Sequence, residues 1–244
     1  MRTAFISDLH SNAEALNRVL ERIESLSVDR FICLGDLVGY NADPDYCVER
    51  VFPLAEWLVR GNHDKAVSGL MDINYFNNIA REAILWTRQA IKKDNLGLIR
   101  NLLPGPLLIE EKFLICHGSP MDENEYIFYT DTIRECFRFM NEHYAGIGLC
   151  FYGHTHMPAI IEENGRAYYP EGLVKLAKGR RYLINSGSVG QPRDGISLAS
   201  FGVFDDREMN YQLFRVEYEI EETQSKVVSA GLPPVLARRL ANGT

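Results

Sequence analysis

One short pattern recurs along this chain. An apolar, β-prone run ends abruptly at a glycine or serine and is followed by Asp, Asn or His. The pattern occurs at residues 3–10, 29–36, 56–64, 112–118, 148–156 and 181–188. The carboxyl ends of strands in α/β proteins are where ligands bind. We therefore expect the strands to end in similar polar loops that meet at one site.

The segments between these runs have helical character. Apolar residues repeat at helical spacing through 12–26, behind a cap at Ser11 or Asn12. Together with the runs on either side this is a β-α-β unit, which implies parallel strands. Further helices are predicted at 44–52, 75–93 and 131–144, and a helix-like tail begins at about Glu219.

Antiparallel strands are also indicated. Residues 106–116 and 158–169 read as hairpins, and the second contains the Asn-Gly pair that a type I′ turn favours. Residues 197–218 read as two more strands around a polar turn. With no linker, repeat or low-complexity tract between them, these elements favour one domain of mixed sheets with flanking helices.

The charge balance argues against some partners. The 244 residues include 26 Lys and Arg against 33 Asp and Glu, a formal net charge of −7. Nucleic-acid polymers and anionic membranes are bound by concentrated Lys and Arg, so we expect neither as a partner. An anionic small substrate would need local positive charge.

Cysteine usage and the amino terminus indicate the compartment. Cys33, Cys116 and Cys150 lie in apolar runs without C-x-x-C spacing, which is typical of small core residues in a reducing environment. The first apolar segment is too short for a signal peptide, and no run approaches the ~20 residues of a membrane span. We predict a soluble, cytoplasmic protein.

His154 and His156 stand in the sequence GHTH, directly after an apolar run. Residues at i and i+2 of a strand point to the same face, so the pair could be incidental on a surface strand. Neutral imidazoles are also the commonest metal ligands, and two on one turn could hold an ion. The glycine before them favours a sharp turn at the strand end.

The rest of the chain favours a metal site. Five of the six histidines sit at strand ends; His143, in the predicted helix 131–144, falls outside the pattern and is expected at the surface or in packing. Each piece alone fits an ordinary turn, helix cap or strand end. The polar residues at the strand ends are Asp8, His10, Asp36, Asn62, His63, Asp64, His117, His154 and His156.

In chain order these residues form the blocks D-x-H, GDxx, GNHD, H and GHxH, and the chain resembles the calcineurin-like metallophosphoesterases. GDLVGY, HGSP and NSGSVGQPRD are most similar to the bacterial and archaeal group that includes diadenosine tetraphosphatases and protein-phosphatase-like enzymes. The resemblance implies a four-layer αββα sandwich of two mixed sheets. The single domain 1–244 then has a motif core at 8–156, supporting strands to about 218 and a helical tail at 219–244.

The resemblance also implies a dinuclear metal centre. One ion is held by Asp8, His10, Asp36 and His156, and the other by Asp36, Asn62, His117 and His154. Each histidine of GHTH then serves a different ion, and Asp36 bridges. Nitrogen, carboxylate and amide donors without a thiolate suit Mn²⁺ or Fe first, and also Zn²⁺ or Co²⁺. Such a centre stays net positive and attracts phosphate.

Catalytic and substrate-binding roles follow from the same resemblance. Metal-activated hydroxide attacks phosphorus, so no Ser or Cys nucleophile is needed. His63 protonates or stabilises the leaving oxygen, and Asp64 fixes the ring of His63. Asn62 holds a phosphoryl oxygen. Three further residues could line the substrate pocket or could serve only in loop packing: Tyr40, Asn41 and Arg193.

The expected activity is hydrolysis of a phosphodiester, a phosphomonoester or a dinucleoside polyphosphate such as diadenosine tetraphosphate. The alternatives are a protein serine/threonine phosphatase and a non-catalytic scaffold or sensor that keeps the fold. The presence of His63 favours catalysis over a scaffold, because the scaffold members of the family have lost their catalytic histidine. We expect a small phosphate-ester or nucleotide partner.

Overall fold

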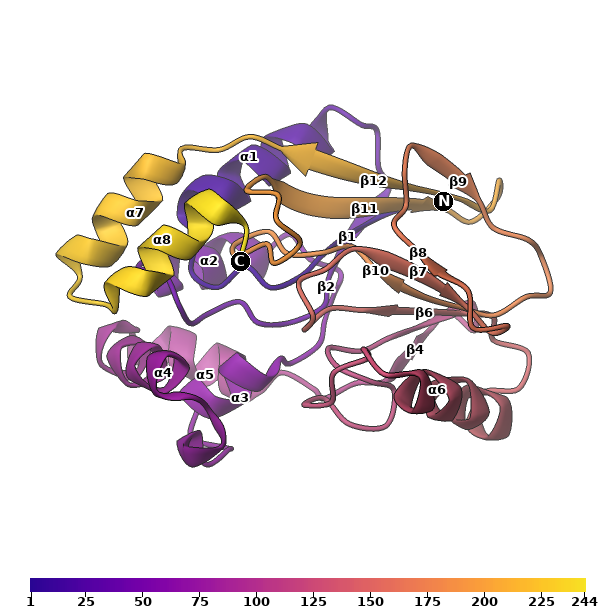
Figure 1. Ribbon diagram of the computed structural model, residues 1–244, viewed down its shortest axis with the longest axis horizontal. Helices are drawn as coiled ribbons and strands as arrows, with labels where there is room; N and C mark the ends of the chain where they lie inside the picture. The colour runs from indigo at the N-terminus through magenta and orange to yellow at the C-terminus, as the bar shows by residue number, and fades with distance from the viewer.

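The computed structural model describes residues 1–244 and contains two mixed six-stranded sheets, which pack face to face between layers of helices (Figure 1). The first sheet has the order β3 (Trp57–Leu58), β2 (Arg30–Cys33), β1 (Arg2–Ile6), β11 (Ala199–Asp205), β12 (Asn210–Val216) and β9 (Leu173–Lys175). The second has the order β4 (Leu107–Ile109), β5 (Phe113–Ile115), β6 (Leu149–Tyr152), β10 (Tyr182–Asn185), β7 (Ala159–Glu162) and β8 (Ala167–Tyr168).

Each sheet contains three neighbouring parallel strands. In the first sheet β1, β2 and β3 are parallel, and in the second β5, β6 and β10 are parallel. Antiparallel hairpins, β11 with β12 and β7 with β8, extend the sheets as the sequence predicts. The carboxyl ends of the parallel strands therefore lie at one edge of the sandwich, where their loops can meet.

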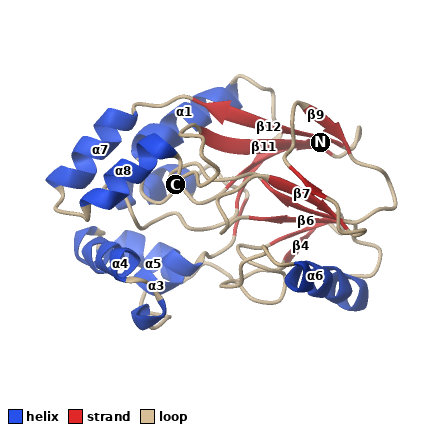
Figure 2. Ribbon diagram, in the orientation of Figure 1, coloured by secondary structure: helices blue, strands red, loops and turns tan.

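Helices cover the outer faces of both sheets (Figure 2). The helices are α1 (Ala13–Glu24), α2 (Pro44–Val51), α3 (Asn62–Val67), α4 (Asn78–Ala90), α5 (Lys93–Arg100), α6 (Thr130–His143), α7 (Ile220–Ser229) and α8 (Pro234–Asn242), with a 3₁₀ turn η1 (Ile73–Tyr75). Apolar residues of α1 and α2 pack on the first sheet, and those of α6 pack on the second. The predicted αββα sandwich is confirmed. None of the helices has the length and apolar composition needed to cross a bilayer.

The two sheets are joined by an aromatic core. The rings of Phe5 and Phe151, one from each sheet, stack with centroids 3.8 Å apart and planes 9° apart. Phe113 meets both rings edge-on, at 5.6 and 5.4 Å. Burial of such rings contributes a large share of core stability, roughly 1.5–3 kcal/mol for each side chain. By holding the two sheets together, this core sets the relative positions of the strand ends that carry the polar loops.

Several elements differ from the sequence predictions. The run at 56–64 yields only the two-residue strand β3, because the chain enters α3 directly at Asn62. The helix predicted at 75–93 starts later, at Asn78, where the side chain of Asn77 caps α4. Helices α3 and α5 and strand β9 were not predicted, since each is short and lacks a full repeat of apolar spacing. The predicted helical tail consists of two helices, α7 and α8.

Candidate metal centre

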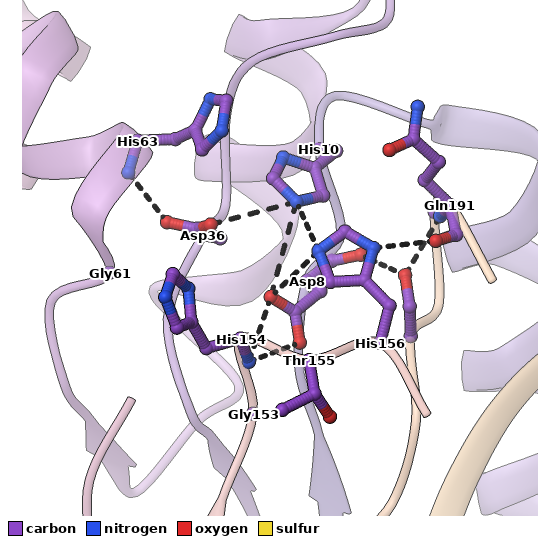
Figure 3. A network of polar contacts seen from close by, with 12 residues as sticks. Asp8, His10, Asp36, Gly61, His63, Gly153, His154, Thr155, His156 and Gln191 are labelled. Carbon is purple, nitrogen blue, oxygen red and sulfur yellow. Dashed lines mark hydrogen bonds and ion pairs between the residues drawn. The ribbon is translucent and has the colours of Figure 1, made fainter. Parts of the chain in front are cut away.

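All seven predicted metal ligands lie together at one edge of the sandwich. They follow β1, β2, β3, β5 and β6, and every one of these side chains is buried. Figure 3 shows the imidazoles of His10, His154 and His156 around the carboxylates of Asp8 and Asp36. Two groups of donors lie close enough to hold a metal ion: Asp8, His10, Asp36 and His156, and Asp36, His117 and His154.

The ligand loops have an unusual backbone. Asp8, His10, Asp36, His154 and His156 all have φ between 47° and 65°, in the left-handed region that non-glycine residues rarely adopt. Hydrogen bonds between loops maintain it: the His10 N–H donates to the Asp36 carbonyl at 3.0 Å. Strained conformations of this kind persist where the surroundings enforce them, which is typical of functional sites.

Two glycines allow the loops to approach. A Cβ at Gly61 would lie 2.0 Å from Asp36 Oδ1, and a Cβ at Gly153 would lie 1.9 Å from Ser7 Oγ. Gly153 does not have a positive φ, and the chain bends at His154 and Thr155, directly after it. This position needs a glycine because another strand end passes too close for a side chain.

In the first group, ring nitrogens face one another and the carboxylates. His10 Nε2 lies 3.1 Å from His156 Nε2 and 3.6 Å from Asp36 Oδ2. His156 Nε2 lies 3.3 Å from Asp8 Oδ1. Asp8 is held in place by the backbone N–H of His154, which donates to Asp8 Oδ2 at 3.0 Å.

In the second group, His117 Nε2 lies 3.3 Å from Asp36 Oδ2 and 3.2 Å from Asn62 Oδ1. His154 Nε2 lies 3.1 Å from the Asn124 carbonyl oxygen, so its Nδ1 is the nitrogen available to an ion. Asp36 belongs to both groups, as a bridging carboxylate must. His154 and His156 fall into different groups of donors.

The hydrogen bonds of three rings fix their tautomers. The Nδ1 atoms of His10, His117 and His156 lie 3.2, 2.8 and 2.6 Å from backbone carbonyl oxygens. A carbonyl only accepts, so each Nδ1 carries the hydrogen, and in the neutral ring Nε2 presents a bare lone pair. In their neutral forms, the three rings therefore direct three lone pairs toward two carboxylates. Such a cluster fits cations, and a backbone carbonyl that accepts from the other ring nitrogen is a usual partner of metal-bound histidine.

The pKa shifts have the same origin. Burial opposes the charge on Asp36, but His117, His63 and His10 outweigh it and hold its pKa well below the usual range. Burial also opposes protonation of His117, yet Asp36 and Asp8 raise the pKa of His117 to about 10. The carboxylates therefore attract positive charge strongly: a proton binds His117 Nε2 where no cation does, and a metal ion would displace that proton to use the lone pair.

His63 lies beside the ligands without joining them. Its backbone N–H donates to Asp36 Oδ1 at 2.8 Å, and its ring lies 4.4 Å from that of Tyr40 and 4.8 Å from that of His10, between centroids. Burial lowers the pKa of His63 to about 4, so the ring is neutral near pH 7. Its Nδ1 is buried without a hydrogen-bond partner. His63 also lines a pocket of about 630 Å³ next to the ligands.

The structure contradicts the role expected for Asp64. Its Oδ1 accepts from the N–H groups of Leu37 and Val38, at 2.9 and 3.3 Å, and its Oδ2 accepts from that of Gly61 at 3.0 Å. Successive residues of a helix point about 100° apart, so Asp64 turns away from the His63 ring. Asp64 ties the loop after β2 to the start of α3.

The structure separates the three residues predicted to line the substrate pocket. Tyr40 lines the pocket, and the Arg193 guanidinium donates to the Tyr40 hydroxyl at 3.3 Å. Asn41 is wrong as a pocket residue: it is fully buried, and its amide donates to the His10 carbonyl at 2.8 Å, which fixes the ligand loop. Sequence reasoning missed Tyr126, whose ring stacks on His154. The three aromatic residues within YIFY at 126–129 are the signal that could have found it.

The fold and these ligands define a metallophosphoesterase. Residues 1–209 match the model of the calcineurin-like phosphoesterase superfamily domain, and the chain belongs to this superfamily. An uncharacterized protein of Methanocaldococcus jannaschii is 41% identical, over 98% of this chain and 97% of its own.

Solved structures agree with this assignment. A crystal structure of a metallophosphoesterase from Sphaerobacter thermophilus is 37% identical and matches with a TM-score of 0.85, over 100% of this chain and 99% of the other. A hypothetical protein from Pyrococcus horikoshii OT3 shares the fold, with 18% identity and a TM-score of 0.80 over 100% of this chain and 98% of the other.

Proposed function

We propose that this protein is a dinuclear metal-dependent phosphohydrolase that cleaves a phosphodiester, a phosphomonoester or a dinucleoside polyphosphate. The observation that carries this proposal is the convergence of three imidazole lone pairs on the carboxylates of Asp8 and Asp36, directly beside the pocket that His63 lines. When bound, two metal ions would acidify water to supply a nucleophile and would polarise the phosphate.

The chain contributes the positions of the reacting groups. Asp36 would hold both ions, and the amide oxygen of Asn62 would complete the second site beside His117. His63 would donate an N–H hydrogen bond to the leaving oxygen. Because its pKa is about 4 before substrate arrives, we expect hydrogen bonding by the neutral ring, and the phosphate anion would raise the pKa toward proton transfer.

Arg193 is the proposed phosphate clamp. Its guanidinium donates to the Tyr40 hydroxyl and, at 3.1 Å, to Gln191 Oε1, both of which are uncharged. Its side chain is half-buried and forms no salt bridge, and the Asp8 carboxylate is one of the negative groups near it. A guanidinium matches phosphate geometry. Arg193 would therefore pair with a substrate phosphate.

The metals and the compartment stay predictions. The donor set favours Mn²⁺ or Fe, with Zn²⁺ or Co²⁺ as alternatives. All five cysteines are free and buried, which supports the cytoplasmic location predicted from the sequence. A serine/threonine phosphatase and a non-catalytic scaffold or sensor remain the competing functions, and the presence of His63 beside the ligands supports catalysis.

Hydrolysis assays test the proposal. Protein loaded with Mn²⁺ should hydrolyse bis-p-nitrophenyl phosphate or p-nitrophenyl phosphate, and His63→Ala should lose most turnover while keeping both metals. Metal content measured by mass spectrometry separates loss of chemistry from loss of the site. Failure to hydrolyse any phosphate ester with Mn²⁺, Fe²⁺, Zn²⁺ or Co²⁺ would refute the enzymatic function.

A further inference from the structure

We propose that the pocket beside the metal ligands binds a nucleoside, so that the substrate is a phosphoester carrying a nucleobase. This inference rests on the proposed phosphoesterase function and adds the chemical class of the esterified group. The pocket is lined by aromatic side chains that the metal chemistry does not use. Tyr75 and Phe76 come from one segment, around η1, and Tyr126 comes from another, before α6.

Tyr75 is the open aromatic surface of this pocket. Its side chain is 81% exposed, and no other aromatic ring packs against it. A large ring left in water at the mouth of a cavity gains from a ligand that covers it. Stacking of a base on such a ring is a common means of binding nucleotides and tolerates any base.

The other aromatic residues are held in place by the site itself. The Tyr126 ring stacks on His154 with centroids 3.8 Å apart and planes 23° apart, and the Phe76 ring meets His63 edge-on at 5.1 Å. These contacts connect the wall of the pocket to one expected metal ligand and to the expected leaving-group residue. A planar group in the pocket would therefore lie next to the reacting phosphate.

The polar groups of the pocket suit a neutral heterocycle better than a second phosphate. The one cationic side chain of the lining, Lys65, is paired with Glu123 at 2.5 Å. Asn124 also lines the pocket, and its Oδ1 is buried without a hydrogen-bond partner. An unpaired buried acceptor is unfavourable until a donor arrives. The N–H groups of a base or the hydroxyls of a ribose supply such a donor.

The size of the pocket sets the number of nucleosides. A cavity of about 630 Å³ lies in the middle of the range of sites that enclose one small ligand. We therefore assign it to a single nucleoside, with the phosphate directed toward Arg193 and the metal ligands.

Binding of reaction products tests this assignment. Protein loaded with Mn²⁺ is titrated by calorimetry with adenosine 5′-monophosphate, ribose 5-phosphate and phenyl phosphate. The nucleotide should bind roughly 5- to 100-fold more tightly than ribose 5-phosphate, the range expected for one stacked base. Tyr75→Ala should remove most of this ratio, and Tyr75→Phe should keep it. Tyr46→Ala is the matched control, since Tyr46 is a 39% exposed tyrosine on α2 outside the pocket.

The outcomes separate the two proposals. Equal affinity for the nucleotide and ribose 5-phosphate, in protein that still hydrolyses aryl phosphates, overturns the nucleoside assignment and leaves the phosphoesterase function intact. Phenyl phosphate that binds as tightly as the nucleotide also overturns it, because the pocket would then accept any ring. A protein that neither binds these phosphates nor hydrolyses an ester with any of the four metals refutes both.

Discussion

The Nε2 atoms of His10 and His156 lie 3.1 Å apart, although the Nδ1 of each ring donates its hydrogen to a backbone carbonyl. Two neutral rings in these tautomers direct lone pairs at each other, which is unfavourable unless a cation lies within reach of both. His10 and His156 are 146 positions apart in sequence. A metal ion bound between these two distant segments would therefore stabilise the folded protein.

Metal removal is expected to destabilise the protein. Ions that bind only the folded state stabilise it by about 2.7 kcal/mol at a concentration 100 times the dissociation constant. Chelation should therefore lower the melting temperature by several degrees, and added Mn²⁺ should restore it. Thermal unfolding followed by circular dichroism measures this change. An unchanged melting temperature in protein confirmed to have lost metal would contradict the lone-pair argument.

Each histidine of GHTH is expected to serve a different ion. His154→Ala and His156→Ala should each reduce the metal content from two ions to one, whereas Asp36→Ala should abolish most binding because both groups share its carboxylate. Elemental analysis of purified variants gives the stoichiometry. His143→Ala, an exposed histidine at the end of α6, is the control. Loss of both ions from either histidine variant would indicate a single shared site.

Asp64→Asn is expected to reduce stability more than it reduces catalysis. The carboxylate accepts three backbone hydrogen bonds through its two oxygens. The amide of Asn has only one acceptor oxygen. Loss of a buried acceptor costs about 1–3 kcal/mol in the free energy of unfolding, which urea denaturation can measure. His63→Ala is the comparison. If Asp64→Asn kept full stability and lost as much turnover as His63→Ala, Asp64 would have a direct role in catalysis.

Arg193→Ala is expected to weaken catalysis without loss of metal. Hydrogen bonds to charged groups are worth about 1.5–3 kcal/mol, so kcat/KM should fall by roughly 10- to 100-fold. Arg193→Lys should recover only part of this, since an ammonium lacks the planar fork. Steady-state kinetics with an aryl phosphate provide the measurement. Normal kinetics for Arg193→Ala would remove this residue from the substrate site.

The tail helices are expected to support the pocket loop. Leu236 of α8 is fully buried in a cluster that includes Ala83 of α4 and the pocket residue Tyr40. Leu236→Ala should reduce the free energy of unfolding by about 2–5 kcal/mol, through lost burial and the cavity that remains. Val228→Ala, on the neighbouring helix α7, changes a residue that is 56% exposed and should have little effect. Equal effects of the two substitutions would show that the tail packs differently.

Sequence reasoning worked best where local pattern and residue chemistry decide the outcome. Helical spacing located α1, α2 and α6 to within two residues, and the Asn-Gly pair located the hairpin of β7 and β8. The order of the short polar blocks resembles that of the calcineurin-like metallophosphoesterases, and this resemblance implied the dinuclear site. The donor types are a property of the residues themselves.

Only the tertiary structure decided how those side chains are directed. The sequence places Asp64 next to His63, but the helical rotation turns the carboxylate toward backbone N–H groups of another loop. It places Asn41 beside Tyr40, yet one residue holds the His10 loop and the other faces the pocket. Tyr75 and Tyr126 come together from segments 51 positions apart. Chain composition and spacing set which donors exist, whereas long-range packing sets the tautomers, the lining of the pocket and the separation of the two ligand groups.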